Sequence, residues 1–168
     1  MGCLRTIGCL TVLVIMAGGV YMTRSLWMAR TPTGPWAPLT PQGAATTRRA
    51  IESISAPKGP AYVQVTGADF ASYALKGTVP PDAQAAVIGD RLHVRERGII
   101  ELVGTIDVPR SGVGEFRATE IKVGDVMLPR VVYSHIFHGA DSATVGLPTA
   151  VGDIRVAHGF ITLYKKIP

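Results

Sequence analysis

One long uncharged stretch near the N-terminus constrains the fold of this chain more than any other feature. The 18 residues from Thr6 to Thr23 carry no charge and lie between two arginines. As a helix rising about 1.5 Å per residue, they extend roughly 27 Å, which is close to the hydrocarbon thickness of a bilayer. The sequence therefore predicts a transmembrane anchor over residues 1–30. Its interfacial residues, charged or aromatic, are Arg5, Tyr21, Arg24, Trp27 and Arg30.

Three other N-terminal signals fit less well. A cleaved signal peptide needs a small-x-small site, of which Ala17-Gly18-Gly19 is a poor version. A lipoprotein box ending at Cys9 would follow the apolar core, whereas here it precedes it. The opening Met1-Gly2-Cys3 fits a myristoylation pattern, but bacteria lack that modification and the span makes a lipid redundant.

Composition favours a bacterial protein with one domain outside the cytoplasm. Arginine outnumbers lysine 12 to 5 and asparagine is absent, as in proteins of GC-rich genomes. The positive-inside count across the span is nearly tied, but short N-terminal tails usually stay inside. We therefore expect a single-pass protein of the bacterial inner (cytoplasmic) membrane with a periplasmic or extracytoplasmic domain. Both cysteines lie in or beside the anchor, so the domain has no disulfide framework.

The rest of the charge is nearly balanced. Residues 41–168 carry 14 basic and 12 acidic side chains, which argues against a nucleic-acid-binding surface. Residues 31–41 hold prolines at every third position, which favours an extended spacer between anchor and domain. Trp36 in this linker has three readings: it rests on lipid headgroups, contacts a partner, or packs on its own domain.

Residues 42–168 are expected to form one α+β domain. Thr40-Pro41 predicts a helix start, and Thr66 with Asp69 resembles a capping box. Glycine and proline punctuation separates short strands with short loops, so we predict a mostly antiparallel sheet with two or three short helices on one face. The predicted helices cover 41–54, 68–76 and 130–138, and the predicted strands cover 61–66, 85–88, 92–94, 99–108, 116–123, 153–156 and 160–164.

The order of these elements resembles a known group of domains. A strand runs directly into Thr66-Gly67-Ala68-Asp69-Phe70, a hairpin with a Gly-Asp turn follows, and the chain closes with Val151–Val156 and His158–Leu163. This arrangement over about residues 60–165 resembles bacterial membrane-anchored domains of the LmeA-like and YceB-like sort. The resemblance implies lipid binding, and it assigns no functional residue to a numbered position.

No catalytic motif stands out. The nucleophile elbow, the phosphate-binding loop and the zinc and haem patterns are all missing from the sequence. His135, His138 and Asp141 are the best candidate metal cluster, but Asp141 lies beyond Gly139, where the helix should end. Helix capping by these histidines is the simpler interpretation. We therefore predict no enzyme activity, no cofactor and no metal.

Two functions follow as expectations. The first is a structural or interaction protein, an accessory subunit docked on integral membrane proteins of a larger complex, such as a respiratory or photosynthetic assembly. The alternative is an extracytoplasmic protein that binds a lipid or another amphiphile. This second function predicts an apolar groove between the sheet and its helices. The candidate groove residues are Phe70, Tyr73, Val132 and Phe137.

Overall fold

The computed structural model describes residues 34–76, 80–97, 99–110, 112–130, 132 and 142–166. The anchor predicted over residues 1–30 lies outside these ranges, as does most of the helix predicted over 130–138. Within the described ranges, no helix is both long enough and apolar enough to cross a bilayer. The predicted α+β class and the antiparallel pairing of the strands are confirmed.

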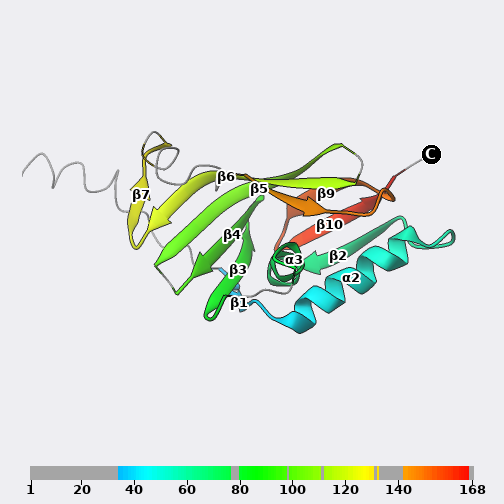
Figure 1. Cartoon of the computed structure of the whole chain (residues 1–168), viewed down its shortest axis with the longest axis horizontal. Helices are drawn as coiled ribbons and strands as arrows, with labels where there is room; N and C mark the ends of the chain where they lie inside the picture. Colours follow the sequence, from blue (N-terminus) through cyan, green and yellow to red (C-terminus); the bar gives the residue numbers. More distant parts are fainter. Residues whose placement is uncertain are drawn as a thin grey trace, which may run out of the picture.

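Two helices and ten strands make up the described part of the chain (Figure 1). In chain order they are β1 (Ala37–Pro38), α2 (Pro41–Ser55), β2 (Tyr62–Thr66), α3 (Gly67–Ala74), β3 (Ala83–Ile88), β4 (Arg91–Glu96), β5 (Ile100–Arg110), β6 (Val113–Val123), β7 (Val126–Leu128), β8 (Ser142–Gly146), β9 (Val151–Ala157) and β10 (Phe160–Lys165).

Both helices begin where the sequence predicts, because a threonine caps each of them. The Thr40 hydroxyl accepts a hydrogen bond from the Gly43 N–H at 3.0 Å, with a proline at the first position of α2. The Thr66 hydroxyl accepts one from the Asp69 N–H at 3.1 Å. Strand β2 thus passes directly into α3, which fixes the direction of α3 relative to that strand.

The strands form two sheets rather than the single sheet expected. The large sheet has the order β1-β3-β4-β5-β6-β7, with β8 also pairing with β6. The small sheet has the order β2-β10-β9, in which Tyr164 lies opposite Tyr62. Local sequence patterns predict both β2 and β10, but not the pairing between them, because their residues lie about a hundred positions apart. The prediction of a single sheet is therefore wrong for the closing hairpin, which forms the small sheet with β2. The strands β1, β7 and β8 were not predicted.

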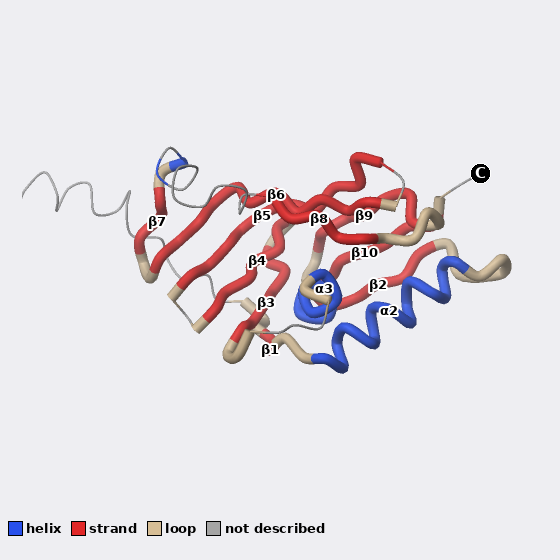
Figure 2. Tube along the Cα trace, in the orientation of Figure 1, coloured by secondary structure: helices blue, strands red, loops and turns tan. Residues whose placement is uncertain are grey.

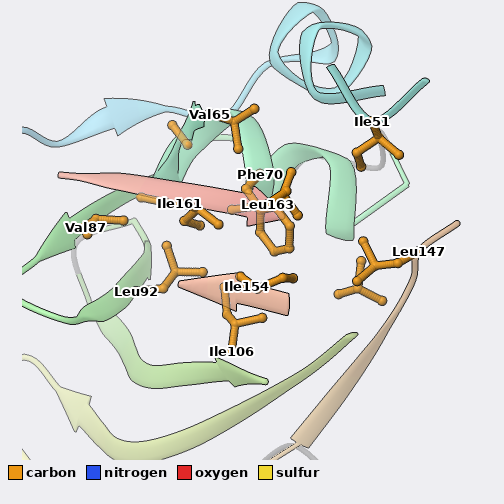
Figure 3. Close-up of a cluster of buried hydrophobic side chains, with 14 of the residues drawn as sticks. Ile51, Val65, Phe70, Val87, Leu92, Ile106, Leu147, Ile154, Ile161 and Leu163 are labelled. Atoms are coloured by element: carbon orange, nitrogen blue, oxygen red, sulfur yellow. The ribbon is translucent and has the colours of Figure 1, made fainter. Parts of the chain in front are cut away.

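Helix α3 lies between the two sheets, and the large sheet curves around it (Figure 2). Helix α2 packs against α3 and the small sheet. The core fills the space between these elements (Figure 3). Its largest fully buried members include Phe70 of α3, Ile51 and Ile54 of α2, and Ile161 and Leu163 of β10.

The part of the predicted linker that the structure describes belongs to the folded unit. Ala37 and Pro38 pair with β3 at the edge of the large sheet, and Leu39 is buried in the core. Gly34 lies so close to Ile88 that an added Cβ would be 2.5 Å from its side chain. The folded unit therefore includes residues 34–41, which were predicted to belong to the linker.

Candidate functional site

An apolar pocket lies between α3 and the face of the large sheet that this helix covers. Its volume is about 140 Å³, and among the described residues that line it only Thr144 carries a polar side chain. The other lining residues are Phe70, Ala71, Ala74, Leu75, Leu92, Val94, Leu102, Phe116, Ala143 and Val145. An apolar cavity of similar size, about 150 Å³, is enough to hold benzene, whereas drug-sized ligands need about 300 Å³ or more. This pocket therefore accepts a ring or the end of an alkyl chain, not a whole lipid.

Small residues create this pocket. Ala71 and Ala74 on α3 face β8 and the sheet without filling the gap. Gly104 of β5 allows the Phe116 ring to lie over the strand, because an added Cβ would be 2.7 Å from two atoms of that ring. Alternation along the strands supplies the rest of the apolar lining from every second residue.

The structure does not bring the predicted groove residues together around one pocket. Phe70 is buried and lines the pocket, whereas Val132 is 39% exposed and Phe137 lies outside the described residues. Tyr73 lies beside the pocket, where its hydroxyl donates a hydrogen bond to the Gly146 carbonyl at 2.9 Å. Burial raises the pKa of the Tyr73 phenol, and the nearby Arg48 opposes that rise. Of the three groove residues within the described ranges, only Phe70 lines the pocket itself.

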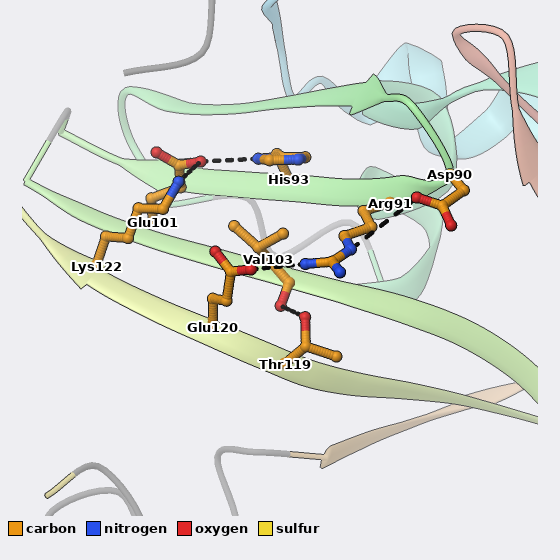
Figure 4. A network of polar contacts seen from close by, with 8 residues as sticks. All are labelled: Asp90, Arg91, His93, Glu101, Val103, Thr119, Glu120 and Lys122. Atoms are coloured by element: carbon orange, nitrogen blue, oxygen red, sulfur yellow. Dashed lines mark hydrogen bonds and ion pairs between the residues drawn. The ribbon is translucent and has the colours of Figure 1, made fainter. Parts of the chain in front are cut away.

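The opposite face of the large sheet carries a buried polar network that the sequence reading missed (Figure 4). His93 Nδ1 lies 2.8 Å from Glu101 Oε1, and the Lys122 ammonium donates to the same oxygen at 3.4 Å. All three side chains are buried, with residue exposures of 7%, 8% and 6%. Glu101 and Lys122 are directly opposite each other on β5 and β6, and the histidine comes from β4. One carboxylate thus joins three neighbouring strands.

A second ion pair continues this network toward solvent. The Arg91 guanidinium donates to Glu120 at 2.6 Å, again between β4 and β6. The Thr119 hydroxyl donates to the Val103 carbonyl at 3.1 Å (Figure 4). The Glu101 carboxylate and the Lys122 ammonium carry opposite charges, so each compensates the other where they are buried. A shift of register between β5 and β6 would separate them.

Trp36 packs on its own domain, which was one of its three readings. Its ring meets the His93 ring edge-on, with centroids 6.2 Å apart and an interplanar angle of 87°. The Arg95 guanidinium lies 4.0 Å from the Trp36 ring centroid and also donates to Gln84. Aromatic and cation–π contacts therefore hold the start of the domain against β4.

An exposed apolar surface lies at the end of the large sheet where β5 begins and β6 ends. We call it the apolar end, and it consists of Ile99, Ile100, Val123, Val126 and Met127. The most exposed members are Ile99 at 57% and Val126 at 42%. The Gly124 N–H donates to the Ile99 carbonyl at 2.6 Å, which joins the β6–β7 turn to the β4–β5 turn. Val123 lies directly opposite both Ile100 and Val126, so these three side chains share one face, whereas Met127 lies opposite Lys122 on the other face. The apolar end therefore extends around the end of the sheet.

The remaining predicted site residues lie outside the described residues. These are the anchor residues Arg5, Tyr21, Arg24, Trp27 and Arg30, and the candidate metal cluster of His135, His138 and Asp141. Over the described ranges, no group of three or more His, Cys, Asp or Glu side chains is placed to hold a metal ion.

Comparison with known proteins returns no match to a family model, to a curated protein or to a solved structure. The resemblance to LmeA-like and YceB-like domains therefore stays a prediction from the order of elements. The site itself must be interpreted from its own residues.

Proposed function

We propose that this chain is a membrane-anchored, non-enzymatic interaction protein, an accessory subunit that docks on the extramembrane part of an integral membrane complex through its apolar end. The observation that carries this proposal is the clustering of four exposed aliphatic side chains and one methionine at one end of the large sheet. Soluble proteins seldom leave such residues contiguous at the surface unless something covers them.

The charged residues at the rim favour a protein partner over the lipid bilayer. Arg97 and Asp125 sit in the β4–β5 and β6–β7 turns, and both are exposed. A carboxylate at the tip of a turn opposes insertion into hydrocarbon, whereas protein interfaces surround an apolar centre with a polar rim. The buried ionisable groups of the opposite sheet face pair with one another, which supports a structural role for them.

Gentle detergent extraction from native membranes, followed by sizing and mass spectrometry of co-purifying chains, tests this proposal. The native chain is expected to migrate with a stoichiometric set of membrane subunits. Ile99→Lys combined with Val126→Lys should release it, because two desolvated ammonium groups would face an apolar partner. Gln42→Lys, which adds a charge on the exposed side of α2, is the matched control and should leave the complex intact.

If the native chain migrates alone at 17.8 kDa, the accessory-subunit proposal fails. If the double lysine variant co-purifies as well as the native chain, docking through the apolar end fails while the subunit role remains.

A second candidate function, amphiphile binding, is favoured by the apolar pocket under α3. The pocket has room for a short alkyl chain, and its opening would leave a polar headgroup in solvent. Hexanoate is a suitable probe, added to the full chain in perdeuterated detergent. Nuclear Overhauser contacts between its chain protons and the Phe116 ring are expected. Ala74→Leu should abolish them by filling the pocket, and contacts that persist in this variant would place hexanoate elsewhere.

A further inference from the structure

The small sheet has one face that no core residue occupies. Its inner face carries Ile161 and Leu163, which are fully buried. The alternate residues of β2 and β10 point the other way, and we call this surface the outer face. It carries the aromatic residues Tyr62, Phe160 and Tyr164 and the polar residues Gln64, Thr162 and Arg155. Tyr62 is 55% exposed and Phe160 is 44% exposed.

The two tyrosine rings of the outer face lie close together, and the Arg155 guanidinium lies over one of them. The Tyr62 and Tyr164 rings have centroids 6.0 Å apart, consistent with their opposite positions on β2 and β10. The Arg155 guanidinium lies 5.2 Å from the Tyr164 centroid and 3.3 Å from the Asp153 carboxylate. Tyrosine, with an apolar ring and a polar hydroxyl, is suited to the boundary between water and membrane.

A basic cleft of about 590 Å³ borders these rings. It is lined by Ala61, Gly152, Asp153, Arg155, Tyr164, Lys165 and Lys166. Three cations and one carboxylate give the cleft a surplus of two positive charges. Residues 41–168 hold 14 basic and 12 acidic side chains, a surplus of two as well. The net charge of the cleft therefore equals the net charge of residues 41–168, so the other charged side chains of that region cancel one another.

The three cations of the cleft differ in their contacts within the protein and in their exposure to solvent. The Lys165 ammonium donates to the Ala56 carbonyl at the end of α2 at 2.7 Å. Arg155 pairs with Asp153, but its side chain remains 71% exposed. Lys166 is exposed at the rim. Arg155 and Lys166 are thus the two groups best placed to meet an anion from outside.

We propose that this outer face and its cleft bind the phosphate groups of an anionic lipid bilayer surface, with the tyrosines and Phe160 seated among the headgroups. Each lysine or arginine near an anionic membrane contributes about 1 kcal/mol, which is about fivefold in binding. The exposed aromatic rings add apolar contact that a soluble phosphate does not offer.

The short tether to the predicted anchor supports this choice of ligand, and this step rests on the proposed membrane anchor. Gly34 is already packed against β3, and Arg30 ends the predicted span. Four residue steps reach at most about 14 Å at about 3.5 Å each. An anchored domain on so short a tether stays beside the bilayer, within reach of its headgroups.

A fluorescence experiment on the full chain tests the proposal. Cys3 and Cys9 are replaced by serine, so that one introduced cysteine carries an environment-sensitive nitrobenzoxadiazole (NBD) label. The test position is Gln64→Cys on the outer face, and the control position is Gln42→Cys on the exposed side of α2. Each labelled chain is mixed with vesicles of phosphatidylcholine, with or without phosphatidylglycerol, and then floated on a density gradient.

The proposal predicts a blue shift and a rise of NBD emission at position 64 only when phosphatidylglycerol is present. Position 42 should not respond. Lys166→Gln should raise the phosphatidylglycerol content needed for half the response about fivefold. Arg155→Gln with Lys166→Gln should remove the response, and both variants should keep the native melting temperature because the replaced side chains are exposed.

Other outcomes overturn the proposal. An equal response in pure phosphatidylcholine would show that charge plays no part, and a response to inorganic phosphate without vesicles would assign the cleft to a free anion. The anchor is read separately from flotation with phosphatidylcholine vesicles. If the chain does not float with these vesicles, the proposed membrane anchor is wrong. The response to phosphatidylglycerol still tests lipid binding by the cleft in that case.

Discussion

Alternate residues of β4 point to opposite faces of the large sheet and meet different surroundings. Leu92 and Val94 face α3 and line the apolar pocket. His93, between them, faces the other way and joins the buried network with Glu101 and Lys122. The covered face is held by apolar contact, which depends on volume and area, whereas the opposite face is held by directional pairs between charged groups.

This difference shows that the covered face mainly stabilises the domain, whereas the opposite face mainly specifies the register of its strands. Apolar packing against α3 stabilises the domain but tolerates side chains of similar size. The buried network contributes less net stability, since desolvation offsets most of the attraction, yet it penalises any shift of register that would separate its partners. We therefore expect large losses on both faces, with different patterns of rescue.

The largest loss is expected on the covered face. Phe70→Ala removes a fully buried ring from between α3 and both sheets, and should lower the free energy of unfolding by about 4 kcal/mol. Urea unfolding followed by circular dichroism measures this change. Phe160→Ala, at an exposed ring, is the control and should cost about 0.5 kcal/mol or less. Similar losses at the two positions would contradict the assigned core.

A somewhat smaller loss is expected on the opposite face, and it should be reversible by a second change. Glu101→Leu leaves the Lys122 ammonium buried without its carboxylate and should cost about 3 kcal/mol. Adding Lys122→Met should recover about 1–3 kcal/mol, because the orphaned charge is then gone. The same urea experiment provides the double-mutant cycle. Strictly additive losses would mean that the two side chains do not interact.

The smallest effect is expected at the margin of the covered face. Tyr73→Phe removes the hydrogen bond to Gly146 and should cost about 1 kcal/mol near neutral pH. Burial raises the folded-state pKa of Tyr73 above its unfolded value of about 10. The stability this adds is complete below pH about 10 and is lost as pH rises through the folded-state pKa.

The pH dependence gives that prediction its check. The difference in unfolding free energy between the native chain and the Tyr73→Phe variant should shrink when melting is repeated at increasingly alkaline pH. A difference that stays constant would show that the phenol titrates alike in both states.

Local patterns predicted most of the helices and strands, and they failed where distant residues meet. Thr40 and Thr66 mark the helix starts directly, because capping is a contact over three residues. The pairing of β10 with β2 has no local signal. His93, Glu101 and Lys122 come from three separate strands, and nothing in their spacing shows that they converge.

The candidate sites follow the same rule. Phe70 lies on the apolar face of its helix, which is a local pattern, and it lines the pocket from α3. The residues that line the pocket from the strands come together because the large sheet curves, and local sequence patterns do not predict that curvature. The apolar end has no local signal, because its residues come from separate segments that the pairing of Ile100 with Val123 and of Val123 with Val126 brings together.

Photo-crosslinking in native membranes tests docking through the apolar end most directly. A benzophenone amino acid is introduced at Val126 in one chain and at Gln42 of α2 in a control chain, since both positions are exposed. The account predicts that irradiation couples position 126 to one integral membrane protein, found by mass spectrometry, and couples position 42 to none or far more weakly. Crosslinking to lipid alone at position 126, or equal crosslinking from both positions, would contradict it.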